Sequence, residues 1–465
     1  MAEKRASSRA AGWAAAAGLA ATAALLASPS GGARAEAGPP ANGFAVAPYV
    51  VDAGPDRATV AFHLDAPGPA EVVVFEGRSA GRPPRVFSSP DPRRTHFVEV
   101  DGLAPGSVYR YEVRGPGAAR TPPGDASFQL RTACRAGEAF TFAVYGDPRP
   151  GETLTRRHHR AVVERILEVE PAFTLVLGDL VDDGADPRQW EAFFAAEAEL
   201  RRRAAIFPVL GDNDHAGGEG VAARYLPRAR PEPYAFTWGG VRFFALSTWD
   251  TLGAQPVEEL DADGEQLAWL AAELDRPEVR AAPFRVVFMH DPVLISRGRS
   301  SPTLRRALGP LLAEKGVDLV FASAHHYERV QRDGVAYVAS GGGGAELVWR
   351  DEDPALPAAV AAKRHHFCRV DVGPGSLELR AVADDGTVLD SLTLVPGGTR
   401  GEDAAERFRR AARRLARPIE IAPVDGAPAL RVDLFSPDCP ECRRLLERGL
   451  PALAARHRVT LDVRY

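Results

Sequence analysis

Residue types that bind metals recur at the ends of short apolar runs in this chain. Three runs end in Gly-Asp and two end in histidine, at Asp147, Asp179, Asp212, His290 and the pair His325-His326. An apolar run that stops abruptly at Gly or Asp is typical of a buried β-strand. The sequence therefore predicts five strand ends that carry carboxylates or imidazoles.

In α/β folds, ligands gather outside the carboxyl ends of the strands. Five such ends can bring three Asp and two or three His to one place. A mixture of oxygen and nitrogen ligands suits a pair of divalent metal ions. We therefore expect a metal centre at the edge of a sheet.

The surrounding residues, 138–395, alternate strand and helix patterns and predict an α/β domain. Helical patterns cover residues 158–167, 190–200 and 265–274. A run of four glycines, 341–344, breaks the pattern after an expected strand at 336–340, and further strands are expected at 367–372 and 377–382.

The preceding segment, residues 44–132, has short strand-like runs separated by Pro, Gly and Asp turns, which predict an all-β domain. Alternation from Val108 onward includes Tyr109 and Tyr111. This segment resembles fibronectin type III sandwiches, in which a Tyr pins a strand corner.

Length and composition set the limits of the interpretation. The chain has 465 residues, so two or three domains are expected. A net charge of −5 gives no general attraction to nucleic acid, and we expect no nucleic acid partner. The sequence leaves the oligomeric state open.

Residues 1–35 have the pattern of a signal peptide. A basic start precedes the Ala/Leu run 14–27, and Ala33-Arg34-Ala35 fits a cleavage site. We expect export to the periplasm or the extracellular space, with no membrane span in the mature chain.

Residues 397–427 form an expected linker, and residues 428–465 follow it. This last segment predicts a strand, Cys439-Pro-Glu-Cys442, a helix and a second strand, and it resembles the start of a thioredoxin-like fold. Cys439 and Cys442 are therefore redox candidates. A structural disulfide or half a zinc site is the alternative.

The five strand ends, in this order, resemble the calcineurin-like metallophosphoesterases, and with the β domain before them the purple acid phosphatases. The family pattern is Asp-x-His, Gly-Asp, Gly-Asn-His-Asp/Glu, a lone His, and Gly-His-x-His. The resemblance implies a β-sandwich flanked by helices, and hydrolysis of phosphate mono- or diesters by a metal-activated hydroxide.

The resemblance also implies two divalent ions, either Fe, Mn or Zn. Asp147 would bind the first ion, and Asp179 would bridge both. Asp212 or Asn213 would bind the second ion together with His290. His325, or else His326, would complete the first site.

Three departures from the family pattern concern the chemistry. Arg149 stands where the pattern has the His of Asp-x-His. Arginine cannot bind a cation, so Arg149 either clamps a phosphate oxygen during catalysis or is a surface residue paired with a carboxylate.

The segment 211–215 replaces Gly-Asn-His-Asp with Gly-Asp-Asn-Asp-His. Aligned without a gap, Asp212 is the ligand and Asn213 takes the catalytic position. With a shift of one residue, Asn213 is the ligand and His215 protonates the leaving group.

In the last pattern, Ser323 or Ala324 replaces the first His. The second metal site is therefore either weak or absent.

An exported phosphoesterase is the leading interpretation. A degenerate relative that binds a ligand or acts as a scaffold in the cell envelope is the second, and a thiol-disulfide protein is the third.

Overall fold

The computed structural model describes residues 43–76, 83–215, 219–227, 233–248, 264–298 and 300–396, and the backbone of three short strands between residues 423 and 464. The expected signal peptide, the pair Cys439 and Cys442, and nearly all of the expected linker lie outside the described residues. Within these ranges, no helix combines the length and the apolar character needed to cross a membrane.

The first described region consists of strands, as predicted. They are β1 (Phe44–Val51), β2 (Ala58–Glu76), β3 (Arg85–Val100), β4 (Val108–Arg114) and β5 (Gln129–Arg131). The Tyr109 hydroxyl accepts a hydrogen bond from the backbone N–H of Ala104 (2.8 Å), so this Tyr does pin a strand corner. The fibronectin-like assignment itself stays a prediction.

These strands continue directly into the α/β region, because β1 pairs in parallel with β8 at Val51 and Ile206. The result is one eleven-stranded sheet whose main path runs β18-β17-β16-β6-β7-β8-β1-β2-β4-β5, with β3 paired to β2. Its α/β strands are β6 (Phe140–Tyr145), β7 (Phe173–Leu177), β8 (Ala205–Val209), β16 (His366–Val372), β17 (Leu377–Ala383) and β18 (Val388–Leu394).

A second sheet of seven strands has the order β15-β13-β14-β12-β11-β10-β9. Its strands are β9 (Tyr234–Trp238), β10 (Val241–Ala245), β11 (Arg285–Phe288), β12 (Leu319–Ala322), β13 (Tyr327–Arg332), β14 (Val335–Ser340) and β15 (Val360–Ala362). Phenylalanine rings join the two sheets: Phe173 and Phe142 of the first sheet stack on each other, and both meet Phe243 of the second edge-on.

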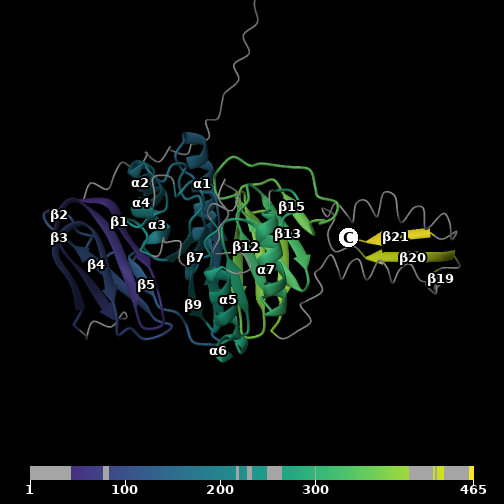
Figure 1. Cartoon of the computed structure of the whole chain (residues 1–465), viewed down its shortest axis with the longest axis horizontal. Helices are drawn as coiled ribbons and strands as arrows, with labels where there is room; N and C mark the ends of the chain where they lie inside the picture. Colours follow the sequence, from purple (N-terminus) through teal and green to yellow (C-terminus); the bar gives the residue numbers. More distant parts are fainter. Residues whose placement is uncertain are drawn as a thin grey trace, which may run out of the picture. The chain divides into compact units, whose positions relative to one another are not determined.

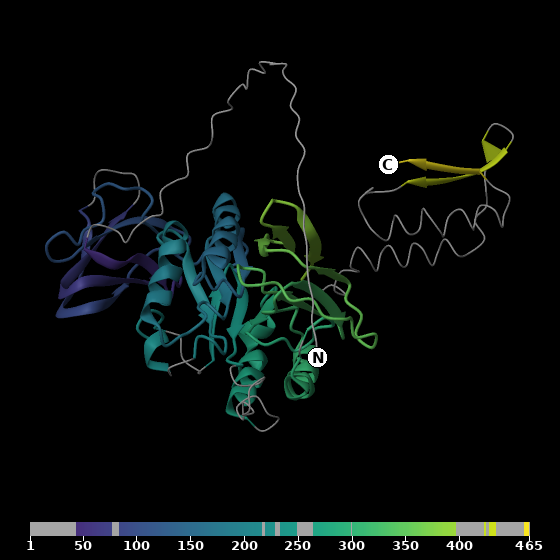
Figure 2. The same cartoon turned by 90° about the horizontal axis from the view of Figure 1, so that it is seen from above.

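Helices flank the two sheets (Figures 1 and 2). They are α1 (Thr153–Glu168), α2 (Pro187–Ala196), α3 (Ala198–Arg201), α4 (Glu219–Ala222), α5 (Glu265–Asp275), α6 (Pro277–Arg280) and α7 (Pro302–Glu314). The apolar faces of α1 and α2 pack with Tyr145 and Val176 of the first sheet. Those of α5 and α7 pack with Val287 and Val320 of the second. The predicted β-sandwich flanked by helices is confirmed.

The C-terminal strands are β19 (Pro423–Val424), β20 (Ala427–Asp433) and β21 (Thr460–Arg464). β20 and β21 pair in parallel, from Ala429 with Thr460 to Asp433 with Arg464. A parallel pair is what a strand-helix-strand unit requires. The thioredoxin likeness stays a prediction, because the cysteines lie outside the described residues.

A buried ion pair ties the second sheet to the first. Arg329 of β13 donates to both carboxylate oxygens of Asp390 in β18 (2.6 and 3.1 Å), and the Tyr327 hydroxyl donates to the same carboxylate (2.7 Å). All three side chains are buried. Because both charges are desolvated, removal of one partner is far more costly than loss of a surface pair.

We therefore predict that Asp390→Ala lowers the free energy of unfolding by about 3–5 kcal/mol. Chemical denaturation measures the change. The control is Glu199→Gln, which removes an exposed pair with Arg203 (3.0 Å) and should cost no more than about 0.5 kcal/mol. Equal effects of the two substitutions would contradict this role of Asp390.

Candidate metal centre

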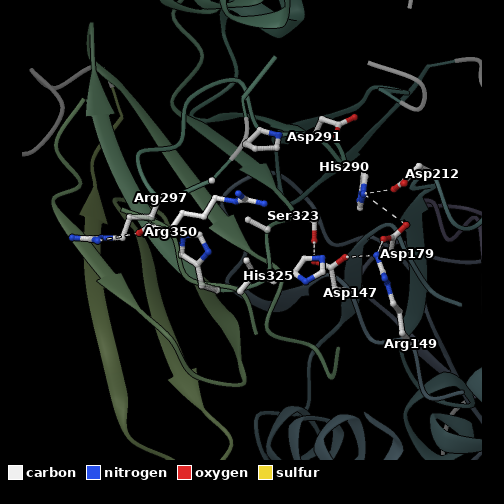
Figure 3. A pocket seen from close by; sticks show the side chains of 15 residues that line it. Asp147, Arg149, Asp179, Asp212, His290, Asp291, Arg297, Ser323, His325 and Arg350 are labelled. Carbon is white, nitrogen blue, oxygen red and sulfur yellow. Dashed lines mark hydrogen bonds and ion pairs between the residues drawn. The ribbon is translucent and has the colours of Figure 1, made fainter. Parts of the chain in front are cut away.

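The predicted strand ends border one cavity of about 320 Å³ (Figure 3). Asp147 follows β6, Asp179 follows β7, Asp212 follows β8, and His290 follows β11. All four line the cavity, together with Arg149, Ser323 and the pair His325-His326, which follows β12.

Three of the predicted ligands lie close enough to share an ion. One ligand atom each from Asp147, Asp179 and His290 lies within 4.8 Å of the other two. The Asp147 and Asp179 side chains are only 1% exposed. Two carboxylates and an imidazole suit Mn²⁺, Fe²⁺ or Zn²⁺.

Glycines allow the strand ends to approach this closely. A Cβ at Gly178 would lie 2.6 Å from both the Gly211 nitrogen and His290 Nδ1. Gly178 also has a φ of +89°, which side chains with a Cβ rarely adopt. The glycine run predicted as a break packs behind Asp147, where Gly343 N–H donates to the Gly146 carbonyl (2.9 Å).

His290 is oriented by its own backbone contact. Its Nδ1–H donates to the Leu177 carbonyl (2.7 Å), and its Nε2 lies 3.7 Å from Asp179 Oδ1 and 3.5 Å from Asp212 Oδ1. Burial lowers the pKa of His290, but the carboxylates of Asp212, Asp291 and Asp147 outweigh it and raise the pKa to about 9. A cation that binds Nε2 therefore replaces a proton there.

Arg149 faces the ligand carboxylates rather than open solvent. Its Nη2 donates to Asp179 Oδ2 and lies 3.8 Å from Asp147 Oδ1, and its side chain is 18% exposed. Of the two sequence interpretations, pairing with a carboxylate is therefore observed, although the pair is mostly buried. The reason is the charge of Asp147 and Asp179, which lies within reach of residue 149.

The segment 211–215 is held by Asp214, for which no sequence pattern indicated a role. Asp214 is buried and accepts hydrogen bonds from Gly211 N–H (2.9 Å) and Val181 N–H (3.2 Å). Burial raises the pKa of Asp214 to about 7. These bonds connect the loops that carry Asp212 and Asp179, so Asp214 positions the site without lining it.

Asn213 and His215 do not line the cavity. Asn213 donates to Asp179 through its backbone (3.2 Å) and its side-chain amide (2.8 Å). His215 is 9% exposed, and burial lowers its pKa to about 4. Neither residue therefore lies at the cavity in this structure, and the catalytic positions predicted for them stay predictions. Asp212 does line the cavity, at an exposed position.

Neither predicted histidine after β12 joins the three clustered ligands. His326 is buried, and its Nε2 pairs with Glu328 Oε2 (3.1 Å). His325 lines the cavity, but its Nδ1–H donates to the Glu346 carbonyl (2.9 Å). Instead, Ser323 donates its hydroxyl to Asp147 Oδ2 (2.8 Å). The expected closure of the first site by His325 or His326 is therefore not seen.

The opposite wall of the cavity is basic. Arg350 is exposed, and Figure 3 shows its side chain extending toward Ser323. Within the described ranges, Arg350 has no carboxylate partner. Arg297 differs, because its guanidinium pairs with Glu352 (2.9 Å) and lies over Trp349 (4.8 Å to the ring centre). No sequence pattern pointed to either arginine.

Residues 140–328 match the family model of the calcineurin-like phosphoesterases. This central region, with its strand-end site, is thus similar to the calcineurin-like phosphoesterases. More particularly, its relatives include purple acid phosphatases.

Purple acid phosphatases 22 and 21 of Arabidopsis thaliana are 23% and 26% identical to this chain over 258 and 257 residues. These alignments cover 51% of this chain and 54% and 53% of the two relatives. The chain therefore spans about half the length of these relatives.

Two solved structures share the fold. Purple acid phosphatase PPD1 from seeds of yellow lupin (Lupinus luteus) has a TM-score of 0.63 at 16% identity, covering 76% of this chain and 75% of its own. PhoD has a TM-score of 0.59 at 14% identity, covering 81% of this chain and 97% of its own.

The residues present fit one divalent cation. Asp147 Oδ1 is buried and has no hydrogen-bond partner among the described residues, so it is an acceptor that a cation would satisfy. Asp179, His290 and the exposed Asp212 supply further donors around it. The two ions that the family implies would need further ligands, and neither histidine after β12 joins this cluster.

We predict that Asp214→Ala lowers the free energy of unfolding by about 2–3 kcal/mol, because two buried N–H groups lose their acceptor. Thermal and chemical denaturation measure the change. Asp183→Ala is the matched control, since the exposed Asp183 carboxylate accepts a local hydrogen bond from Ala185 N–H. This substitution should cost about 0.5 kcal/mol. An unchanged stability of Asp214→Ala would contradict its positioning role.

Proposed function

We propose that this chain is an exported, metal-dependent phosphoesterase that hydrolyses phosphate mono- or diesters. The observation that carries the proposal is the group Asp147, Asp179 and His290, buried at one cavity. Arg350, which has no carboxylate partner among the described residues, lies on the opposite wall. Export rests on the signal-peptide pattern of residues 1–35.

Asp147, Asp179 and His290 would hold the cation, and Asp212 lies close enough to His290 to join them. A divalent cation held by these residues would lower the pKa of a bound water and would neutralise phosphoryl oxygens. The Nδ1–H bond to Leu177 holds the His290 ring so that Nε2 faces the carboxylates.

Arginines are the chain's own means of binding the phosphoryl group. Arg350 offers its guanidinium from the opposite wall, and no carboxylate of the described residues pairs with it. Arg149 has five N–H donors, of which Asp179 takes only part. Both can donate to phosphate oxygens in the bidentate manner that guanidinium groups favour.

His325 is the side chain whose position supports protonation of the leaving oxygen, since it lines the cavity and His215 does not. The Glu346 carbonyl fixes its Nδ1–H. Its Nε2 then carries the transferable proton when the ring is charged.

A degenerate binding or scaffold protein is the second candidate. The contact of Arg149 with Asp179 favours it, because a guanidinium on a ligand carboxylate competes with a cation. The thiol-disulfide candidate rests on Cys439 and Cys442, which lie outside the described residues, and stays a prediction.

The direct test is hydrolysis of an aryl phosphate by the full chain loaded with Mn²⁺, Zn²⁺ or Fe²⁺. We predict turnover that falls on the order of 100-fold or more in Asp179→Asn, because this change removes a charged ligand. Asp183→Asn, an exposed carboxylate lost outside the cavity, should retain the activity of the unmodified chain. Absence of turnover with every metal and at every pH would support the degenerate candidate.

A second prediction concerns Arg350. Arg350→Ala should raise KM roughly 10-fold and change kcat little, because the guanidinium binds the phosphoryl group in both the ground and the transition state. The matched control is Arg305→Ala, an exposed arginine on α7 away from the cavity. A fall in kcat at unchanged KM would contradict a binding role for Arg350.

A further inference from the structure

Asp179 is the carboxylate that would bridge two metal ions, and its two oxygens have different surroundings. Oδ2 accepts from Arg149 Nη2 and from the Asn213 amide (2.8 Å). Among the described residues, Oδ1 accepts a hydrogen bond from the Asn213 backbone N–H alone (3.2 Å) and faces His290 Nε2 at 3.7 Å. A bridging carboxylate needs both oxygens for cations, whereas here one oxygen already binds a guanidinium.

The two oxygens of Asp147 also have different surroundings. Its Oδ2 accepts from the Ser323 hydroxyl (2.8 Å). Its Oδ1 has no hydrogen-bond partner among the described residues and lies 3.8 Å from Arg149 Nη2. One oxygen of each carboxylate, together with His290 Nε2, therefore stays open for a single ion.

Three positions at which the family pattern has a histidine ligand supply no ligand to this cluster. Arg149 replaces one of these histidines, and Ser323, which donates its hydroxyl to Asp147, stands where another is missing. His326 pairs with Glu328 instead. Arg149, however, brings a permanent positive charge to the place where the pattern has a neutral ligand.

The Asp179 carboxylate already holds a permanent positive charge. Arg149 Nη2 donates to Asp179 Oδ2 and lies 3.8 Å from Asp147 Oδ1. A second divalent cation bound to Asp179 Oδ2 would lie next to this guanidinium. Two cations at such a distance repel strongly where the surroundings are poorly solvated.

We propose that this centre holds one divalent cation, and that the guanidinium of Arg149 takes the place of the second. The proposal deepens the phosphoesterase function by fixing its metal content. Arg149 then serves as a fixed cation that can bind a phosphoryl oxygen without leaving the carboxylates.

The test is the metal content of the full chain, stripped with a chelator, reloaded with Mn²⁺ and freed of excess metal. Elemental analysis should find about one Mn²⁺ per chain, and electron paramagnetic resonance should show an isolated ion. Two spin-coupled ions per chain, or none, would overturn the proposal.

The decisive variant is Arg149→His, which replaces the guanidinium by a metal ligand and should raise the content to two ions per chain. Arg305→His makes the same change on the exposed face of α7 and should stay at one. A folded Arg149→His variant that still holds one ion would overturn the role given to Arg149.

Arg149→Gln is a second variant that tests the proposal if Arg149→His does not fold. It removes the charge without adding a strong ligand. It should keep one ion and bind it about 10-fold more tightly, since a nearby positive charge is gone. Unchanged affinity would contradict the proposal.

An inactive chain with one ion would refute the phosphoesterase function alone, and an active chain with two ions would refute this inference alone.

Discussion

Two carboxylates that share a buried site constrain everything around them. With ligand atoms within 4.8 Å of each other, Asp147 and Asp179 repel by roughly 3–4 kcal/mol at the effective dielectric constant of a protein site. Positive charge must compensate this repulsion. Arg149 and the protonated His290 supply it when no metal is bound, and a cation replaces the His290 proton. The glycines at the strand ends allow this arrangement, because they let the strand ends and their charged side chains lie close together.

The sequence predicted the strands that carry these groups, since buried apolar runs ending in Gly-Asp leave few alternatives. It therefore placed Asp147, Asp179 and His290 correctly at one edge. It could not predict where the rings after β12 point. Those directions depend on contacts with the Glu346 carbonyl and the Glu328 carboxylate, and no local sequence pattern predicts these contacts. Asp214 was visible in the sequence, but its two backbone contacts join separate loops and need the fold to be known.

Arg149 shows how one substitution can change a centre without changing its fold. The first sheet, the second sheet and the helices keep the arrangement shared with purple acid phosphatase PPD1 and PhoD. The chemistry of the site depends on side chains carried by that arrangement, and these can vary independently. A permanent guanidinium charge next to Asp179 binds anions but cannot activate water. Arg149 would therefore bind the phosphoryl group without activating water, whereas a second metal ion would do both.

Anomalous X-ray diffraction from a Mn²⁺-soaked crystal shows whether the strand ends form a metal centre. We expect one anomalous peak bounded by Asp147, Asp179 and His290, with Arg149 still on the Asp179 carboxylate. No peak at this edge of the sheet, or a pair of peaks with Arg149 displaced, would contradict this expectation.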